Sequence, residues 1–445
     1  MSIWHIIIKN IEKDTFDVKV SASEEKYILN TVQLGNDPSA LGTNIFKELR
    51  FAKIEPKDEV LDLLHLSLGI YTTDQVVSRK AHGFQEWSRH FKIYMPVSSL
   101  DKWENAKEDL QKLLSFLSGD KWEIYFRKNI ITEGKQIKLI KNHNPNKIEK
   151  VALFSGGMDS FIGAIDLLEN KKKVTFVSHY KRGADKSAQT ILYENLRKKY
   201  GDKSFSKYQF YVQPNQKHAK ASKEESSRAR SFLFLCLGLI VANSLDETIE
   251  FIIPENGLIS LNVPLTGTRL SSHSTRTTHP YYLSTFKKMI SELGIKNKII
   301  NPYQWKTKGE MMVECKNQRL LKKLNHETLS CSHSENSRYS GMRPGIQCGY
   351  CVPCIIRQSA EKKSSITGTE YVHNITQNVP SQKLVSGGDI RAFKLSLKHL
   401  ENRPRRSIMF DILSSGPLPF ESKQELDKYI DVYLRGMEEV KIFLG

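Results

Sequence analysis

Residues 151–160 read Val-Ala-Leu-Phe-Ser-Gly-Gly-Met-Asp-Ser, and this stretch decides the fold. Four apolar residues are typical of a buried strand, two adjacent glycines of a tight loop, and residues 161–169 of a helix. Glycines let main-chain N–H groups turn inward, and the first N–H groups of a helix have no partner of their own. The stretch therefore predicts a cradle for phosphate groups, made by Ser155, Gly156, Gly157, Met158, Asp159 and Ser160.

The end of this loop argues against one common class of phosphate site. A Walker A loop ends in Gly-Lys-Ser or Gly-Lys-Thr, whereas this loop ends in Asp159-Ser160, which disfavours γ-phosphate hydrolysis. Asp159 has two interpretations, since it either holds Mg²⁺ near the phosphates or caps the helix. The alternative for the whole stretch is a plain turn. A second Ser-Gly-Gly-Asp at 386–389 lacks a full preceding strand, so we interpret it as a linker with Asp389 capping the next helix.

The segments after this loop alternate between strands and helices. We expect strands at Val151–Phe154, Val174–His179, Phe210–Gln213 and Ile249–Pro254, separated by helices near 160–170, 186–200 and 228–245. Such alternation indicates parallel strands with helical crossovers, so the predicted fold class is α/β with a doubly wound parallel sheet.

The length of 445 residues is enough for two or three folded units. The polar run 142–147 and a second polar stretch, 374–388, suggest an N-terminal α+β domain at 1–148, a central domain at 149–370, and a linker with C-terminal helices at 371–445. In the first unit, expected to be self-contained, we predict these elements: strands Trp4–Ile8, Phe16–Val20, Phe91–Pro96 and Trp122–Arg127, and a helix Leu100–Leu117. The last helix has a plausible start at Ser422, with Glu425 returning the capping bond.

Four of the six cysteines, Cys331, Cys348, Cys351 and Cys354, are spaced as C-x16-C-x2-C-x2-C. Two overlapping C-x-x-C turns and an upstream thiol can bind Zn²⁺ tetrahedrally, and a closed site of four cysteines is structural because it leaves no position for water. The alternatives are a redox dithiol or unpaired thiols. His333 is a substitute ligand in principle, but a surface histidine is the better interpretation.

The formal net charge of +18 suits a polyanionic partner, either nucleotide phosphates or nucleic acid. Residues 1–150 carry 23 basic and 21 acidic side chains, so almost all of the excess follows residue 150. The longest apolar run, Phe232–Ala242, is shorter than the roughly 20 residues of a membrane span. The first residues lack a basic region and a cleavage site, so we expect no membrane association and a cytoplasmic location.

The Ser-Gly-Gly-Met-Asp-Ser loop resembles that of the PP-loop (HUP-like) ATP pyrophosphatases, which cleave ATP between the α and β phosphates to adenylate a substrate. With the downstream Cys-Gly-Tyr-Cys-Val-Pro-Cys at 348–354, the chain resembles the QueC family of 7-cyano-7-deazaguanine synthases. Arg230, at the head of an apolar helix, and Lys308, in Lys-Gly-Glu, resemble further family positions. The resemblance implies catalytic roles for Asp159, Ser160, Arg230 and Lys308, and it implies ATP, Mg²⁺ and Zn²⁺ as cofactors.

The segments 254–265 and 274–280 follow a predicted strand, where ligand crevices form. Glu255 is a candidate acceptor for a guanine-like base, Asn256 and Asn262 are candidate donors, and Arg276 is a candidate partner of a carboxylate. His279 is the weakest candidate. The alternative for each residue is a polar loop that satisfies its own backbone.

With its additional domains the chain is most similar to the QueC-like components of anti-phage systems of the Qat type, with the CBASS type as second choice. The resemblance lies in the segments 83–89, 118–122 and 275–280. It implies an ATP-dependent ligase that activates 7-carboxy-7-deazaguanine or a similar acid and transfers it to an amine, such as that of a partner protein. In that case residues 1–141 would bind the partner through exposed aromatics such as Trp87, Trp103 or Trp122; the alternative for each tryptophan is that it fills the core of its own domain. The alternatives are free 7-cyano-7-deazaguanine synthesis, a tRNA-modifying enzyme with an RNA-binding N-terminal unit, and a non-catalytic assembly subunit.

Overall fold

The computed structural model describes residues 2–32, 41–129, 147–181, 183–214, 224, 226–265, 276–377 and 387–445. Most of the first expected boundary (142–146), part of the second polar stretch (378–386) and the loop positions Ser274 and Thr275 lie outside the described residues.

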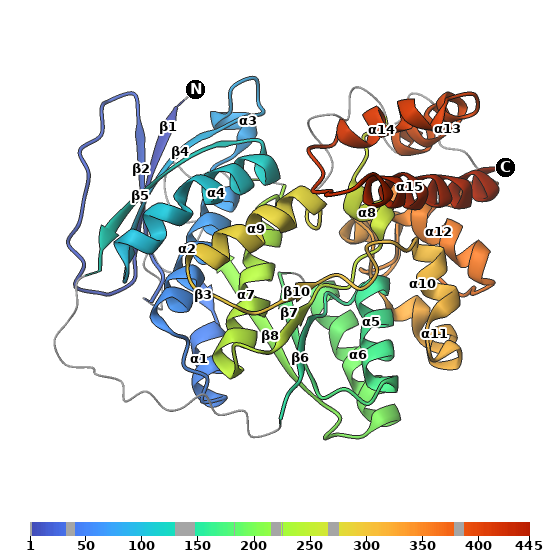
Figure 1. Cartoon of the computed structure of the whole chain (residues 1–445), viewed down its shortest axis with the longest axis horizontal. Helices are drawn as coiled ribbons and strands as arrows, with labels where there is room; N and C mark the ends of the chain where they lie inside the picture. Colours follow the sequence, from blue (N-terminus) through green and yellow to red (C-terminus); the bar gives the residue numbers. More distant parts are fainter. Residues whose placement is uncertain are drawn as a thin grey trace.

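The central unit is built on a six-stranded sheet with the order β10-β9-β6-β7-β8-β3 (Figure 1). Its strands are β6 (Lys150–Leu153), β7 (Val174–Tyr180), β8 (Phe205–Pro214), β9 (Glu250–Ile252), β10 (Ile299–Ile300) and β3 (Leu41–Thr43). All neighbours pair in parallel except β3, which runs antiparallel to β8. The expected α/β class with a parallel sheet is confirmed, although β8 begins five residues before the expected strand and β9 is shorter.

Helices cover both faces of this sheet, as alternation along β6 requires. Val151 and Leu153 pack into one core, and Ala152 packs into the other. The main covering helices are α5 (Met158–Glu169) and α6 (Gly183–Tyr200) on one face, and α7 (Arg230–Leu245) and α9 (Pro280–Glu292) on the other.

The strand order creates a crevice at the end of β6. From β6 the chain continues to β7 on one side and later returns to β9 on the other side. The loops after β6 and β9 therefore leave the sheet side by side, which is the position at which open α/β sheets bind ligands. The glycine loop and residues 254–257 meet at this point.

The first part of the chain forms a second, four-stranded sheet with the order β2-β1-β4-β5, in which every pairing is parallel. Its elements are β1 (Ile3–Lys9), β2 (Glu25–Asn30), β4 (His90–Val97), β5 (Lys121–Lys128), α1 (Ile45–Phe51), α2 (Asp58–Val76), α3 (Arg79–His82) and α4 (Leu100–Ser118). The expected strand at 16–20 is wrong, because this segment alternates in burial without pairing to a neighbour, and β2 takes the place beside β1.

The two sheets share one hydrophobic core, so the first unit is not self-contained. β3 lies within the first 148 residues yet forms the edge of the central sheet. Leu64 and Leu68 of α2 belong to the same cluster as Phe232 and Leu239 of α7.

Trp103 and Trp122 are buried in this shared core, with 0% and 3% of their surface exposed, which corrects the expectation that they face a partner. Trp87 is half-buried, and the guanidinium of Arg228 lies over its ring. The described tryptophans of this unit therefore contribute to its own packing.

The remaining helices lie on the opposite side of the molecule from the four-stranded sheet (Figure 1): α10 and α11 pack into the core that contains α5, and the other α-helices pack into a third core. They are α8 (Gly257–Leu261), α10 (Lys308–Glu314), α11 (Gln318–Leu324), α12 (Val352–Ser364), α13 (Gly388–Leu400), α14 (Arg405–Leu413) and α15 (Lys423–Leu444), with short 3-10 turns η2 (Asn325–Glu327) and η3 (Ser334–Ser340).

The expected helix start at Ser422 is confirmed, since the Ser422 hydroxyl accepts from Glu425 N. The Glu425 carboxylate accepts from Glu421 N instead of returning the bond to Ser422. The expected cap by Asp389 is wrong for its own helix, because its carboxylate accepts from Val352 N at the start of α12 (2.9 Å).

Candidate functional site

The glycine loop, the candidate anion cradle, connects β6 to α5. Gly156 lies in the left-handed region (φ +85°), a conformation that glycine adopts without strain. The Ser155 hydroxyl lies 3.1 Å from that of Ser160 and accepts from Gly157 N (3.2 Å). Gly157 precedes the first residue of α5, so the amino end of that helix completes the cradle.

Two residues that sequence analysis did not single out hold this loop in place. Gln189 of α6 donates its side-chain amide to Ser155 O (3.2 Å) and to His179 O (3.3 Å). The Ser330 hydroxyl accepts from Met158 N (3.3 Å), and the neighbouring Leu329 N donates to Gly156 O (2.8 Å). The only sequence signal for Ser330 is its place next to a zinc-ligand candidate.

Four of the expected site residues meet at the crevice after β6 and β9. Asp159, on the first turn of α5, forms an ion pair with the Lys308 ammonium, and both side chains are about 95% buried. Its other carboxylate oxygen accepts from the Asn256 side-chain amide (2.6 Å) and from Asn256 N (3.2 Å). Glu255, the residue after Pro254, contacts the same carboxylate.

Burial and charge shift the pKa values of the two carboxyl groups in opposite directions. Burial would raise the pKa of Asp159, but the Lys308 ammonium overcomes it and lowers the pKa to about 2. For Glu255, burial and the negative charge of Asp159 both raise the pKa well above its usual range. The cluster therefore holds one carboxylate and one neutral carboxyl group beside a single ammonium.

The geometry around Asp159 agrees with neither of its two expected roles. The expected helix cap is wrong, because the Asp159 carboxylate bonds to Asn256 and Lys308 instead of the N–H groups of its own helix. The expected Mg²⁺ role does not fit this arrangement, because an ammonium and an amide occupy both oxygens of a buried carboxylate. The described geometry assigns Asp159 to the placement of Lys308.

The C-terminal helix holds Lys308 from the other side. Lys308 is the first residue of α10, whose cap Thr307 forms a capping box with Glu310. Glu439 of α15, which is buried, accepts from Gly309 N (3.2 Å) and from the Thr307 hydroxyl. Arg435 of α15 adds bonds to Glu310 (2.7 Å) and Trp305 O (2.7 Å). Glu439 has no local sequence signal, because Thr307 and Gly309 lie more than 100 residues away from it.

Arg230 lies at the carboxyl end of β7, near the cradle. Its guanidinium donates to His179 O (3.2 Å) and Asp185 (3.2 Å), and 35% of the side chain is exposed. His179 O also accepts from Gln189, which in turn bonds Ser155 O. Arg230 is therefore linked to the first loop residue through one shared carbonyl and one amide side chain.

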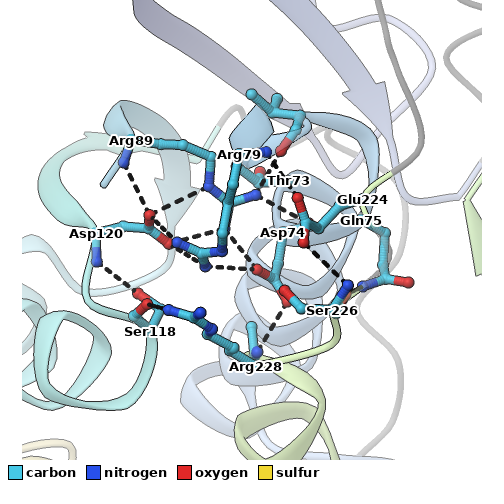
Figure 2. A network of polar contacts seen from close by, with 12 residues as sticks. Thr73, Asp74, Gln75, Arg79, Arg89, Ser118, Asp120, Glu224, Ser226 and Arg228 are labelled. Atoms are coloured by element: carbon cyan, nitrogen blue, oxygen red, sulfur yellow. Dashed lines mark hydrogen bonds and ion pairs between the residues drawn. The ribbon is translucent and has the colours of Figure 1, made fainter. Parts of the chain in front are cut away.

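Figure 2 shows a buried network of charged residues at the amino end of α7. Arg79 and Arg89 each form ion pairs with Asp74 and with Asp120, and the Arg89 and Asp120 side chains are fully buried. Burial of two opposite pairs is tolerable only because each charge has several partners. Arg89 and Asp120 belong to the segments 83–89 and 118–122, which sequence analysis had assigned to resemblance alone.

The other expected substrate residues lie outside the Asp159 cluster. Asn262 adopts a left-handed conformation at the end of α8. Arg276 donates to Phe116 O (3.0 Å) and stacks on the Phe116 ring (4.4 Å). His279 caps α9 and bonds the Ser415 hydroxyl (3.0 Å). Asn256 shares the cluster, but its side-chain oxygen also caps α8.

A cavity of about 360 Å³ opens where the two expected substrate segments face each other. Ser260 and Thr278 contribute to its wall from these segments, and Asn301, which bonds Glu255 O (2.8 Å), connects it to the cluster. Tyr429 and Glu425 of α15 line another side. The expected substrate side chains Glu255, Asn256, Asn262 and Arg276 are not among its lining residues.

The four cysteines form a compact candidate metal centre. Their sulfur atoms all lie within 4.8 Å of one another, and the Cys331–Cys351 and Cys348–Cys354 pairs are 3.9 Å apart. Tetrahedral Zn²⁺ with Zn–S bonds of about 2.3 Å requires sulfurs about 3.8 Å apart, so the set fits zinc. The Cys331 sulfur accepts from His333 N and Cys348 N (both 3.2 Å), and the Cys331 thiol lowers the pKa of Cys351 to about 6.

His333 is exposed, as expected, although its Nδ1 atom lies 4.0 Å from Cys348 Sγ. The metal centre is tied to the cradle through the chain that precedes Cys331. Fully buried Arg357 of α12 donates to Thr328 O (2.9 Å) and pairs with Glu361 (2.9 Å), and the next residues are Leu329 and Ser330 of the cradle wall.

No model of a known protein family matches this chain, and no curated protein matches it. Among the described residues, no helix combines the length and the apolar character needed to cross a membrane.

Proposed function

We propose that this chain is a PP-loop ATP-dependent ligase of the QueC-like type, which forms AMP and pyrophosphate. The observation that carries the proposal is the meeting of the cradle at Ser155–Ser160 with Lys308 at the crevice beside β6. A loop of N–H and hydroxyl donors suits the phosphates of ATP, and a neighbouring ammonium suits the charge that moves onto the leaving pyrophosphate.

The proposed reaction has two chemical steps. A carboxylate oxygen of the substrate attacks the α-phosphorus, the bond to the β-phosphate oxygen breaks, and pyrophosphate leaves with the electron pair. An amine then attacks the acyl carbon, loses a proton, and displaces AMP. Gly157 N, Ser155 and Ser160 would bind the phosphates, while Lys308 and Arg230 would offset their negative charge.

The proposed acid is 7-carboxy-7-deazaguanine or a similar heterocyclic acid, and the amine is ammonia or an amine of a protein encoded alongside, in an anti-phage system. The neutral carboxyl group of Glu255 can donate a hydrogen bond, and Asn256 and Asn301 hold its backbone and surroundings in place. The cavity beside Asn301 offers space for the acceptor or the ring.

The test is mass spectrometry of the products formed from ATP and 7-carboxy-7-deazaguanine, with and without the neighbouring proteins. We expect AMP and pyrophosphate, together with either an amide product or a mass increase on the partner; a nitrile would require a second ATP, which adenylates the amide oxygen so that AMP leaves with it. Ser160→Ala should abolish turnover, since it removes a cradle hydroxyl, whereas Ser414→Ala at an exposed serine should not. ADP with inorganic phosphate would contradict the proposal.

A further inference from the structure

Glu224 and residues 226–229, which precede α7, lie against a charged network contributed by the first 129 residues (Figure 2). We infer that Asp74 is a positioning residue for Arg230, acting through the amino end of α7. The inference rests on the proposed function of Arg230 beside the cradle, and it assigns a catalytic purpose to the N-terminal unit.

The first step is the direction of the Asp74 carboxylate. One of its oxygens forms ion pairs with Arg89 (2.6 Å) and Arg79 (3.4 Å). The other oxygen accepts from Ala229 N (2.9 Å), the main-chain donor directly before Arg230. Because Asp120 binds both arginines from the opposite side, the carboxylate is held from several directions and cannot turn away from Ala229 without leaving a buried cation short of a partner.

Further contacts hold the residues before Ala229. Arg228 stacks on the Trp87 ring (4.0 Å) and donates to Ser118 O (2.9 Å). Earlier in the chain, the Glu224 carboxylate accepts from Arg79 N (2.7 Å) and from Ser226 N (2.9 Å). The segment that precedes α7 is therefore hydrogen-bonded to α2, α3 and the end of α4.

The held segment is continuous with the cradle. Arg230 bonds His179 O, whose other partner, Gln189, reaches Ser155 O. Tyr71 of α2, one turn before Asp74, packs edge-on against the His179 ring (5.6 Å). Helix α2 thus contacts both the start of α7 and His179, the residue to which Arg230 donates. A change at Asp74 should therefore displace Arg230 before it displaces other residues around the cradle.

The chain offers a matched control at the other end of the same pair of helices. Lys57, which precedes α2, forms an exposed ion pair with Glu247, which follows α7. Lys57→Ala therefore removes a contact between the same two helices, far from Arg230 along both of them. An exposed pair of this kind contributes little to stability.

The experiment compares the full-length Asp74→Asn, Arg230→Ala and Lys57→Ala proteins and the Asp74→Asn/Arg230→Ala double variant. Two quantities are measured: ATP–pyrophosphate exchange with 7-carboxy-7-deazaguanine, and hydrogen–deuterium exchange of the peptide that contains residues 226–232. We expect Asp74→Asn to speed deuterium uptake there and to slow ATP–pyrophosphate exchange by about 2- to 30-fold. In the double variant, Asp74→Asn should cause no further loss beyond that of Arg230→Ala. Lys57→Ala should resemble the wild type.

Unchanged deuterium uptake in Asp74→Asn, or additive losses in the double variant, would overturn the inference. A wild-type rate in Arg230→Ala would instead overturn the role of Arg230 in the proposed function, and deuterium uptake alone would then decide whether Asp74 fixes α7. If Asp74→Asn does not fold, Arg228→Met replaces it, because this change removes the bond to Ser118 O at the half-buried edge of the network. The same two readouts and the same double variant with Arg230→Ala then apply.

Discussion

Three titratable groups lie together at the crevice, and only one of them carries a positive charge. The Lys308 ammonium pairs with Asp159, while Glu255 stays protonated because burial and Asp159 disfavour a second negative charge. Pairs of carboxyl groups whose surroundings separate their pKa values are typical of functional sites. At the scale of single residues, the state of Glu255 is the property most open to measurement.

We expect Glu255→Gln to stabilise the protein increasingly as the pH rises. The pKa of Glu255 is higher in the folded than in the unfolded state, so between about pH 4.5 and that raised value the folded protein binds the additional proton. The wild type therefore loses stability with rising pH through this window, whereas the glutamine variant has no such loss. At pH 8 the variant should therefore be more stable than the wild type in urea unfolding, and by more than at pH 5.

The difference between the two proteins should shrink as the pH falls toward about 4.5, where both unfolded and folded carboxyl groups are protonated. Glu292→Gln, at an exposed glutamate of α9, is the control and should show no such trend. A pH-independent difference for Glu255→Gln would mean that Glu255 is ionised in the folded protein.

What the sequence reveals about the site depends on how local each contact is. The cradle at 155–160 was predictable because strand, glycines and helix follow one another within a few residues. The convergence of Asp159 with Lys308, 149 positions later, was suggested only by resemblance. Ser330, Glu439 and Asp74 were not predictable, since each acts on a partner that only the tertiary fold brings near.

At the scale of elements, the cysteine cluster fixes the wall of the cradle. The four thiols join the segment before η3, the turn after it and the start of α12, and Cys331 follows Ser330, whose hydroxyl accepts from Met158 N. Loss of the metal should therefore disturb the phosphate loop, because only Cys331 and Ser330 connect the two. The cluster was predictable in full, because its ligands are close in sequence and of one type.

We expect the protein to contain one zinc ion per chain, with Zn–S distances of about 2.3 Å by X-ray absorption. Cys348→Ser should lose the metal, unfold at a lower temperature and show slower ATP–pyrophosphate exchange, since binding of a structural zinc is coupled to folding. His333→Ala should keep both zinc and activity, because four thiolates complete the tetrahedron. A Cys348→Ser protein that keeps its zinc and its stability would refute the site.

At the scale of the whole molecule, the boundary near residue 148 separates segments of sequence and not hydrophobic cores. A break in periodicity at 142–147 indicated two units, and each was assigned its own sheet. Neither the pairing of β3 with β8 nor the packing of α2 on α7 has a local signature, because each joins residues more than 150 positions apart. Because the core is shared, we interpret the N-terminal unit as structural support for the candidate site and not as a detachable docking domain.

We therefore expect the chain to tolerate a break between Asn129 and Lys147 but not the loss of either part. Residues 147–445 alone would expose the apolar face of α7 and the unpaired edge of β8, so this fragment should aggregate and bind a hydrophobic dye. When residues 1–132 and 147–445 are produced together, the exposed surfaces cover each other again, so the fragments should co-purify in a 1:1 complex with ATP–pyrophosphate exchange close to that of the intact chain. The measurement is size-exclusion chromatography with light scattering, followed by the exchange assay on the eluted complex. A soluble, monomeric and fully active 147–445 fragment would show that the N-terminal residues are a separable partner-binding domain after all.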